Sequence, residues 1–330
     1  MFMRQAIRET SFLLCFIGVA AGTWQAWSQV EQTSLFPERR EFEFSYIGKI
    51  PEIPAGAKEL RLWVPLGTTR DGQKVVSRAI ETELPYTIEK DPVFGNDLLY
   101  FSLQTPLPPR IDVKVNYHVV TDQKEFQSRK ENAVLEKYLQ PTSLVIINEE
   151  IRRRSRLAIE GKEQLFEKAR GLYEYVLTHM KYDKTISGWG KGDSLRACQV
   201  GAGNCTDFHS LFISLALAAE IPSRFKIGVT IPDQGEGEIP GYHCWAEFYQ
   251  QEEGWRPIDA SEAWKHPEKK EAYFGHFDPN KFMLSVGRDI ELVPKQKGGP
   301  VNILFYPYIE VDGEPQNGSK VSLYYKNINT

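Results

Sequence analysis

The sequence predicts a protein with two kinds of structure: an antiparallel β-sandwich-like domain, and then a domain in which helices precede strands. Apolar and polar residues alternate with period two between about residues 41 and 120, which is typical of half-buried strands. Apolar residues at three-and-four spacing mark helices at about 163–180 and from 205 onward. Strand-like runs follow at 224–231, 242–249 and 255–259, with polar turns at 233–238 and 250–254 between them.

The composition is that of an ordinary globular protein. Its 330 residues are 41% hydrophobic and 25% charged, and the formal net charge is −4. A chain of this length has room for two domains. Because the chain is slightly acidic and has no basic stripe interleaved with aromatic residues, nucleic acid is not an expected partner.

The first 28 residues have the features of a signal peptide. Arg4 and Arg8 precede an apolar run, Phe12–Ala21, that is too short to span a bilayer comfortably. Ala26 and Ser28 are small residues of the kind that a signal peptidase recognises. We therefore expect cleavage near Ser28 and export to a periplasmic or extracellular location, with no stable membrane span afterwards. An uncleaved N-terminal anchor is the alternative.

The β-sandwich-like domain is expected at residues 29–122. Alternating runs such as Phe42–Tyr46, Leu60–Val64 and Ile111–Val119 are separated by turns rich in Pro and Gly, which favours antiparallel pairing. The region contains no catalytic constellation. We expect it to support the second domain or to present substrate to it.

Residues 123–161 are expected to connect the two domains. This segment is charged, is interrupted by Pro141, and predicts one short helix at about 149–159. The second domain, residues 162–330, then begins with a helix whose apolar stripe from Leu165 to Met180 belongs to the core.

Cys205 is expected to be the first residue of the next helix. Asn204 is a good N-cap, and Asp207 stands three residues later, where it can complete a capping box. At a helix start, the unpaired N–H groups and the positive end of the dipole favour a thiolate over a thiol. The alternative is a small apolar cysteine in the core, which is the commoner role of a lone Cys.

A glycine-rich loop, Ser187–Asp193, leads toward the cysteine helix. It lacks the strand-to-helix context and the Gly-Lys-Ser/Thr ending of a phosphate-binding loop, so we do not expect nucleotide binding. Loops near a nucleophile often shape the substrate cleft. Trp189 is therefore a candidate substrate-binding residue.

The last two predicted strands bring an imidazole close to a carboxylate. His243 and Trp245 lie on one face, because alternate residues of a strand point the same way. A register with Tyr249 opposite Trp255 would place Asp259 opposite Trp245 and on the diagonal from His243, within reach of a long side chain. A slip of one residue would move Asp259 to the other face.

Cys205, His243 and Asp259 therefore provide a nucleophile, a base and an orienting carboxylate. A thiol at a helix start needs a base for its proton, and that base needs a third group to fix its tautomer. Gln199, six residues before the cysteine, could donate its side-chain amide, together with the Cys205 backbone N–H, to the oxyanion of an acyl intermediate.

Removal of the signal peptide leaves three cysteines: Cys198, Cys205 and Cys244. In an oxidising compartment, three cysteines permit one disulfide and one free thiol. Pairing Cys198 with Cys244 would leave Cys205 free. The sequence leaves this pairing open, because a disulfide must also satisfy a distance requirement.

Three separated blocks of the sequence resemble the transglutaminase-like core of exported bacterial proteins: Gly203–Phe212, Gly241–Tyr249 and Gly254–Ser261. The resemblance covers roughly residues 162–263. It implies an α+β fold of the wider papain-like superfamily, in which a helix carrying the cysteine packs on an antiparallel sheet carrying the histidine and the aspartate. It also implies that Cys205, His243 and Asp259 take the catalytic positions.

The same resemblance extends to two further features. The spacing of Gln199 from the cysteine is similar to that in papain-like enzymes. The stretches Tyr273–Gly275 and Ser285–Asp289 are similar to those that follow the triad in such proteins, and they are expected to close the sheet.

A zinc cluster is an alternative interpretation of the same region. Cysteine and histidine side chains are grouped there, but their spacing fits none of the usual structural zinc patterns; the residues are Cys198, Cys205, His209, His243 and Cys244. We instead expect His209 to be a packed or hydrogen-bonded helix residue and Cys244 to be a core residue. No acidic loop has the spacing of an EF-hand, so we expect no calcium requirement and no cofactor.

The expected function is acyl transfer on carboxamide or peptide bonds through a thioester acyl-enzyme. The substrate would be a protein or peptide, for example of the cell envelope. Crosslinking, deamidation and peptide hydrolysis use the same triad and differ in cleft shape and acceptor access, so the sequence does not choose among them. A binding module that keeps the fold without turnover is the alternative.

Overall fold

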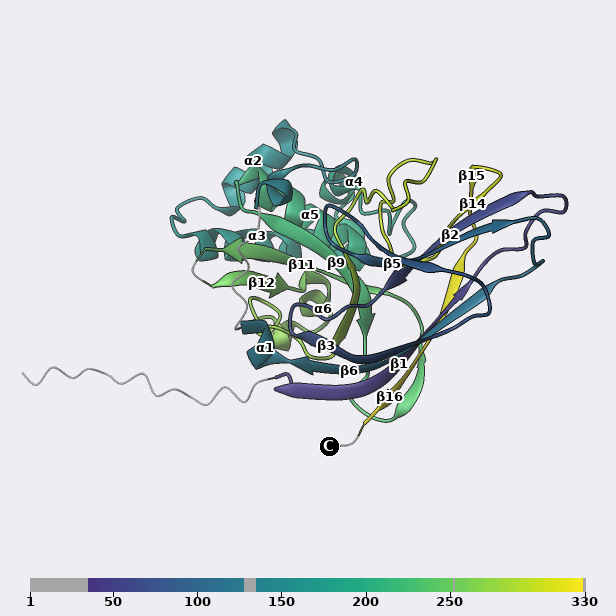
Figure 1. Cartoon of the computed structure of the whole chain (residues 1–330). Coiled ribbons are helices and arrows are strands. Elements are labelled where there is room, and N and C mark those ends of the chain that lie inside the picture. The colour runs from purple at the N-terminus through teal and green to yellow at the C-terminus, as the bar shows by residue number, and fades with distance from the viewer. Residues whose placement is uncertain (1–34, 128–134, 252, 329–330) are drawn as a thin grey trace, which may run out of the picture. The chain divides into compact units, whose positions relative to one another are not determined.

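The computed structural model describes residues 35–127, 135–251 and 253–328. The expected signal peptide at residues 1–28 lies outside the described residues. Figure 1 shows the elements in space. Helices and antiparallel sheets are both present, so the protein has the α+β architecture that the sequence predicts, with a sheet domain before the core.

Two five-stranded antiparallel sheets form the β-sandwich. Sheet A has the order β10 (Glu236–Ile239), β16 (Lys320–Asn327), β1 (Arg39–Lys49), β6 (Asp112–Asp122) and β3 (Gln73–Glu81). Sheet B has the order β15 (Glu314–Gln316), β14 (Tyr308–Val311), β2 (Glu59–Leu66), β5 (Asp97–Gln104) and β4 (Thr87–Lys90).

The period-two pattern of the sequence matches the inner faces of these sheets. Phe42, Phe44 and Tyr46 of β1 are buried, and the residues between them are more exposed. Leu60 and Leu62 of β2 belong to the same apolar cluster. Burial of alternate side chains between two sheets is the main source of stability in such a sandwich.

The sandwich draws strands from both ends of the chain. β16 pairs with β1 over eight residues, and β14 pairs with β2. β10 pairs with the end of β16 as the edge strand of sheet A. The polar turn predicted at 233–238 is therefore partly a strand, because backbone hydrogen bonds to a neighbouring strand are available there. Residues 308–327, which the sequence analysis assigns to the domain 162–330, lie mostly in the sandwich sheets.

The core sheet has four antiparallel strands in the order β12 (Gly254–Ile258), β11 (His243–Gln250), β9 (Ser223–Thr230) and β13 (Lys281–Val286). The first three match the predicted runs. β13 begins just before Ser285–Asp289, the stretch expected to close the sheet. It closes the sheet by pairing with β9.

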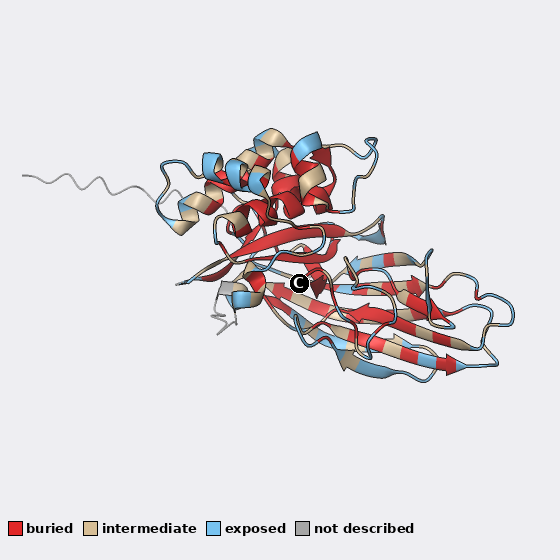
Figure 2. Ribbon diagram, turned by 90° about the horizontal axis from the view of Figure 1, so that it is seen from above, coloured by how far each residue is buried: buried red, intermediate tan, exposed pale blue. Residues whose placement is uncertain are grey.

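Five helices accompany the core sheet: α2 (Glu149–Ala158), α3 (Leu165–His179), α4 (Ser194–Val200), α5 (Cys205–Ala218) and α6 (Ala260–Lys265). α5 is central: it contacts β9 and β11 on one side and α2, α3 and α4 on others, and residues 205–217 are all buried. Figure 2 shows the buried residues concentrated between this helical layer and the strands.

The remaining elements are short. They are α1 (Gln123–Gln127), the 3-10 helices η1 (Leu135–Leu139) and η2 (Pro267–Lys269), and the two-residue parallel strands β7 (Lys181–Tyr182) and β8 (Ala202–Gly203). The helix expected within the connector is α2. Its Ser155 hydroxyl donates to the Leu215 carbonyl of α5, so this helix belongs to the core packing.

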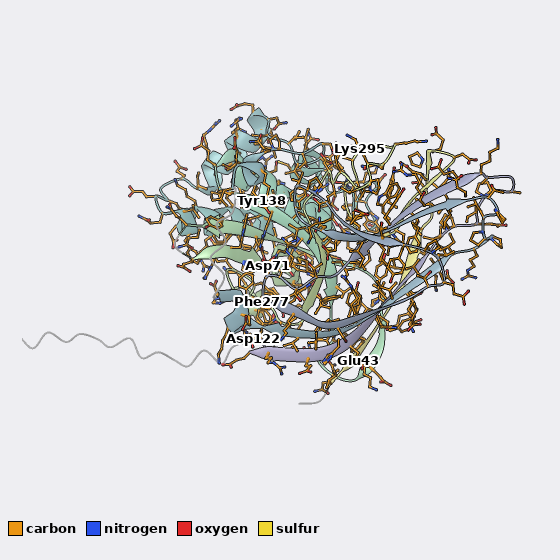
Figure 3. The ribbon with its side chains drawn as sticks, in the orientation of Figure 1. Glu43, Asp71, Asp122, Tyr138, Phe277 and Lys295 are labelled. Atoms are coloured by element: carbon orange, nitrogen blue, oxygen red, sulfur yellow. The ribbon has the colours of Figure 1, made fainter. Side chains whose placement is uncertain are left out.

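A buried charge cluster joins the sandwich to the core sheet. Asp71, labelled in Figure 3, lies in the turn between β2 and β3 with φ of 50°. Its Oδ2 is 2.7 Å from Lys226 Nζ and 3.1 Å from an Arg224 guanidinium nitrogen, both on β9. Glu247 on β11 contacts the same two cations at 2.7 and 2.6 Å. Asp71 and Glu247 together neutralise Arg224 and Lys226, and Arg70 Nε lies a further 3.4 Å from Asp71 Oδ2.

Asp71→Asn should destabilise the protein, because it leaves two buried cations facing one carboxylate. Breaking a buried pair costs about 3–5 kcal/mol. We expect a loss of this order in the free energy of unfolding, measured by urea denaturation. Asp233→Asn, at a side chain that is 80% exposed, should change it by less than about 0.5 kcal/mol. Equal stability of the two variants would contradict a role for the cluster in joining the two parts.

Candidate active site

Cys205 occupies the helix start that the sequence predicts. Gly201 in the left-handed conformation ends α4, and the chain turns through β8 into α5. The Asn204 side chain accepts from the Thr206 N–H, and the Asp207 carboxylate accepts from the Asn204 N–H, which completes the capping box. Cys205 follows directly and is 2% exposed. Its thiol therefore lies at the positive end of a buried helix.

His243 and Asp259 meet at the end of the core sheet. Tyr249 lies opposite Trp255, which is the register that the sequence analysis considered, and His243 is the first residue of β11. Asp259 follows β12 directly and caps α6. The His243 Nε2 is 2.5 Å from Asp259 Oδ2, with both side chains buried. Because Nε2 is used in this contact, Nδ1 is the ring nitrogen left for Cys205.

The charge states of Cys205 and His243 support each other. A hydrogen bond from the Cys244 thiol lowers the pKa of Cys205, and the hydrogen bond and charge of His243 lower it further, to well below the ordinary value despite burial. Burial alone would lower the pKa of His243, but Asp259 and Cys205 raise it to about 10. A thiolate and an imidazolium are therefore the stable pair at neutral pH.

Cys244 is the neutral thiol of this arrangement. Burial and the neighbouring Cys205 hold its pKa well above the ordinary value, so it keeps its proton. Thr206 Oγ1 is 3.4 Å from its sulfur. Cys198, Cys205 and Cys244 are all free thiols, so the pairing of Cys198 with Cys244 that the sequence left open is not formed.

Asp259 accepts hydrogen bonds on both carboxylate oxygens. Lys281 Nζ lies 2.7 Å from Oδ2, the oxygen that also faces His243. Ser261 Oγ and the Glu262 N–H each donate to Oδ1 at 3.0 Å. Burial would raise the pKa of Asp259, but the charges of His243 and Lys281 hold it well below its ordinary value. The carboxylate is therefore ionised and fixed in orientation.

His209 links the cysteine helix to the start of α6. Its Nε2 accepts from the Ala260 N–H at 3.1 Å, which places the proton on Nδ1, and Nδ1 donates to the Cys205 carbonyl at 2.7 Å. Burial lowers the pKa of His209 to about 4, so the ring is neutral. Of the two interpretations that the sequence allows for His209, a zinc ligand and a packed or hydrogen-bonded helix residue, these contacts match the second. Its spacing of four residues from Cys205 was the available signal.

The glycine-rich loop is held beside the start of α5. The Gly190 and Gly192 N–H groups donate to the two oxygens of Asp207 at 2.7 and 3.1 Å. Gly192 has φ of 68°, and a Cβ there would meet Ser210 Oγ at 2.6 Å, so only glycine fits without a shift. Trp189 lies in this loop with 40% of its surface exposed.

Two aromatic hydroxyls lie near the thiol. Tyr242, which precedes His243, accepts from the Asn204 side-chain amide at 2.9 Å. Burial raises the pKa of Tyr182, and the negative charge of Cys205 adds to the effect. Tyr182 is in β7, which pairs with β8 just before the cysteine turn. The Cys205 thiol is therefore partly surrounded by aromatic side chains.

Gln199 makes no hydrogen bond with Cys205, His243 or Asp259 in the described part of the chain. It is in α4, one residue before the helix ends, and its side chain is exposed, whereas Cys205 is buried. The sequence separation of six residues includes the end of α4 and the whole turn into α5. The direction of the Gln199 side chain therefore depends on the tilt of α4 and not on the sequence spacing from Cys205 alone.

Two negative observations concern the described part of the chain. Within residues 35–127, 135–251 and 253–328, no group of three or more acidic, histidine or cysteine side chains is arranged to hold a metal ion. No helix within those same residues is long and apolar enough to cross a membrane.

Comparison with known proteins shows what the region around these residues resembles. A family model described as "Transglutaminase-like superfamily" matches residues 153–260, which include Cys205, His243 and Asp259. An uncharacterized protein of Haemophilus influenzae is 27% identical, over 80% of this chain and 84% of its own length.

Solved structures are similar in fold. One from Cytophaga hutchinsonii, named a "Putative Cysteine Protease", aligns with a TM-score of 0.57 and 14% identity over 88% of this chain and 93% of that one. The periplasmic domain of TgpA from Pseudomonas aeruginosa aligns with a TM-score of 0.35 and 18% identity over 70% of this chain and 91% of that one. Residues 153–260 of this chain are thus similar to the transglutaminase-like superfamily.

Proposed function

We propose that this protein is a cysteine-dependent enzyme that acts on carboxamide or peptide bonds through a thioester acyl-enzyme. The observation that carries the proposal is the meeting of three side chains in one buried site. Cys205 starts α5, His243 starts β11, and Asp259 lies 2.5 Å from the imidazole. Their charge states favour a thiolate nucleophile and a protonated base.

In the first half of the reaction, the Cys205 thiolate attacks the carbonyl carbon of the substrate, and the carbonyl π electrons move to oxygen. The Cys205 backbone N–H is in the first turn of α5, where helix donors have no intrahelical acceptor, so it is available to the oxyanion. His243 then gives its Nδ1 proton to the leaving nitrogen as the carbon–nitrogen bond breaks. A thioester and an amine result.

In the second half, an acceptor attacks the thioester carbon while His243 takes its proton. The carbon–sulfur bond then breaks, which releases the acyl product and restores the Cys205 thiolate. Asp259 keeps Nε2 protonated throughout and so keeps Nδ1 directed at the reacting atoms. Gln199 would assist the oxyanion if its exposed side-chain amide reached the carbonyl oxygen of a bound substrate. The Cys205 N–H is the better supported donor.

Water is the acceptor that we favour, so the reaction would be hydrolysis. Cys205 is 2% exposed and His243 8%, so access is limited for the acyl donor and the acceptor alike, and water is the acceptor that needs the least space. The name of the Cytophaga hutchinsonii relative, a "Putative Cysteine Protease", is consistent with this choice. Deamidation and crosslinking would use the same thioester and remain possible outcomes of the test.

We further propose that the protein acts outside the cytoplasm on a protein or peptide, for example of the cell envelope. The support is the signal-like segment at residues 1–28. In this scheme the sandwich supports the catalytic part, residues 123–161 connect the two, and Trp189 contacts substrate from the glycine-rich loop. A mature N-terminus near residue 29, found by mass spectrometry of the exported protein, would support export; an intact Met1 would contradict cleavage.

Thiol alkylation should reveal the low pKa of Cys205. At about pH 7 an ordinary thiol, with a pKa of about 8.5, is mostly protonated, whereas the Cys205 thiolate persists. Iodoacetamide followed by peptide mapping should therefore label Cys205 first. Cys198 is the control, because burial raises its pKa. His243→Ala should slow the labelling of Cys205, and faster labelling of Cys198 would contradict the assignment.

Substitution should separate the roles of the triad. The assay uses glutamine-containing peptides, with and without a primary amine, and detects products by mass. Cys205→Ala should abolish product formation, whereas Cys198→Ala should not. Asp259→Asn should lower kcat by about two to four orders of magnitude, because the tautomer of His243 is no longer fixed. Turnover by Cys205→Ala would exclude the thiol mechanism. A folded wild-type protein inert toward a broad panel would favour a binding module.

A further inference from the structure

A fourth ionisable side chain contacts the Cys205–His243–Asp259 group. Lys281 is the first residue of β13, and its side chain is 6% exposed. Its Nζ lies 2.7 Å from Asp259 Oδ2, the same oxygen that His243 Nε2 approaches at 2.5 Å. Asp278, at 3.9 Å, is its second anionic neighbour. A buried ammonium group in this position requires an explanation, because burying a charge is costly.

We propose that Lys281 is a positioning residue of this site, which keeps Asp259 ionised and oriented when His243 gives up its proton. The inference rests on the function proposed above. In the resting pair, the imidazolium balances the carboxylate. After proton transfer to the leaving group, the imidazole is neutral, and a buried Asp259 would face it without a counter-charge. Lys281 supplies that counter-charge in both states.

Lys281 also limits how strongly Asp259 holds the proton of His243. A second cation on the same carboxylate oxygen reduces the net negative potential at the imidazole, so the imidazolium is a better acid than it would be opposite Asp259 alone. The general acid step requires this property, because an imidazolium with too high an affinity for its proton transfers it slowly. The other charged or titratable groups around this pair are Cys205, His209, Cys244, Glu262, Asp278 and the tyrosines Tyr173, Tyr182 and Tyr273.

The surroundings of Lys281 fix its position. Its Nζ lies 5.3 Å from the centroid of the Trp245 ring, which itself stacks on the His243 ring. The Lys281 backbone N–H donates to the Asp278 carbonyl, and the residue pairs with Thr230 of β9. Because the Lys281 side chain is already fixed in this position, it can hold the Asp259 carboxylate without an entropy cost for ordering it.

The test uses the pKa of His243, followed by NMR in full-length protein with labelled histidine. The titration is done in the Cys205→Ala background, which removes the thiolate and needs no turnover. Adding Lys281→Met should raise the pKa of His243, because a neighbouring cation is lost. Lys281→Arg, which keeps the charge, should leave it close to the Cys205→Ala value. An unchanged or lowered pKa in the Lys281→Met variant would overturn the proposal.

Lys226→Met is the matched control. Lys226 is also buried in the core sheet, but it pairs with Asp71 and Glu247, so its loss should destabilise the protein without moving the pKa of His243. If Lys281→Met does not fold, Lys281→Gln, which is neutral but polar, takes its place with the same expected shift. An equal shift from Lys226→Met would show a general effect of lost charge and would overturn the specific role.

A kinetic measurement completes the test in the Cys205 protein. Lys281→Met should lower kcat by about tenfold with little change in KM, and Lys281→Arg should recover most of the loss. If wild-type protein has no turnover but the pKa of His243 shifts as expected, the proposed reaction fails while the positioning role stands. If turnover occurs and Lys281→Met retains full kcat, the positioning role fails alone.

Discussion

The structure around the core sheet depends on the interactions of the Asp259 carboxylate. This carboxylate caps α6, and it holds the imidazole of His243 and the ammonium group of Lys281 on one oxygen. Each of these groups belongs to a different element, so a single side chain sets the relative positions of a helix and two strands. Because the site is buried, these interactions are strong and the loss of any one leaves an uncompensated charge.

The sandwich and the core sheet are coupled in a similar way. Asp71 comes from a turn of the sandwich and neutralises cations on β9, and β9 lies beside the strand that carries His243. β10, in the connection from β9 to β11, is hydrogen-bonded into sheet A. The chain therefore enters β11 from a strand that the sandwich holds, which fixes where His243 begins. The sandwich thus contributes to the geometry of the site without supplying a reacting group.

Local chemistry explains what could be predicted from sequence. The start of α5 at Cys205 follows from a capping box of four consecutive residues, and the register of β11 and β12 follows from a short turn and two facing aromatic residues. The features that could not be predicted from the sequence depend on non-local contacts. Lys281 is 22 residues from Asp259 and has no periodic signal, and β10 becomes a strand through pairing with β16. The exposure of Gln199 depends on the packing of α4, which spacing does not encode.

Cys205 is proposed to form a thioester with substrate. Detection of this covalent intermediate is the most direct test. A peptide p-nitroanilide would be mixed with the protein, quenched in acid within the first turnover, and analysed by intact mass and peptide mapping. We expect the mass of the protein to increase by that of the acyl fragment. The added group should be located on Cys205, in the Asp259→Asn variant as well as in the wild type. Product release with no adduct on Cys205 at any quench time would contradict this proposal.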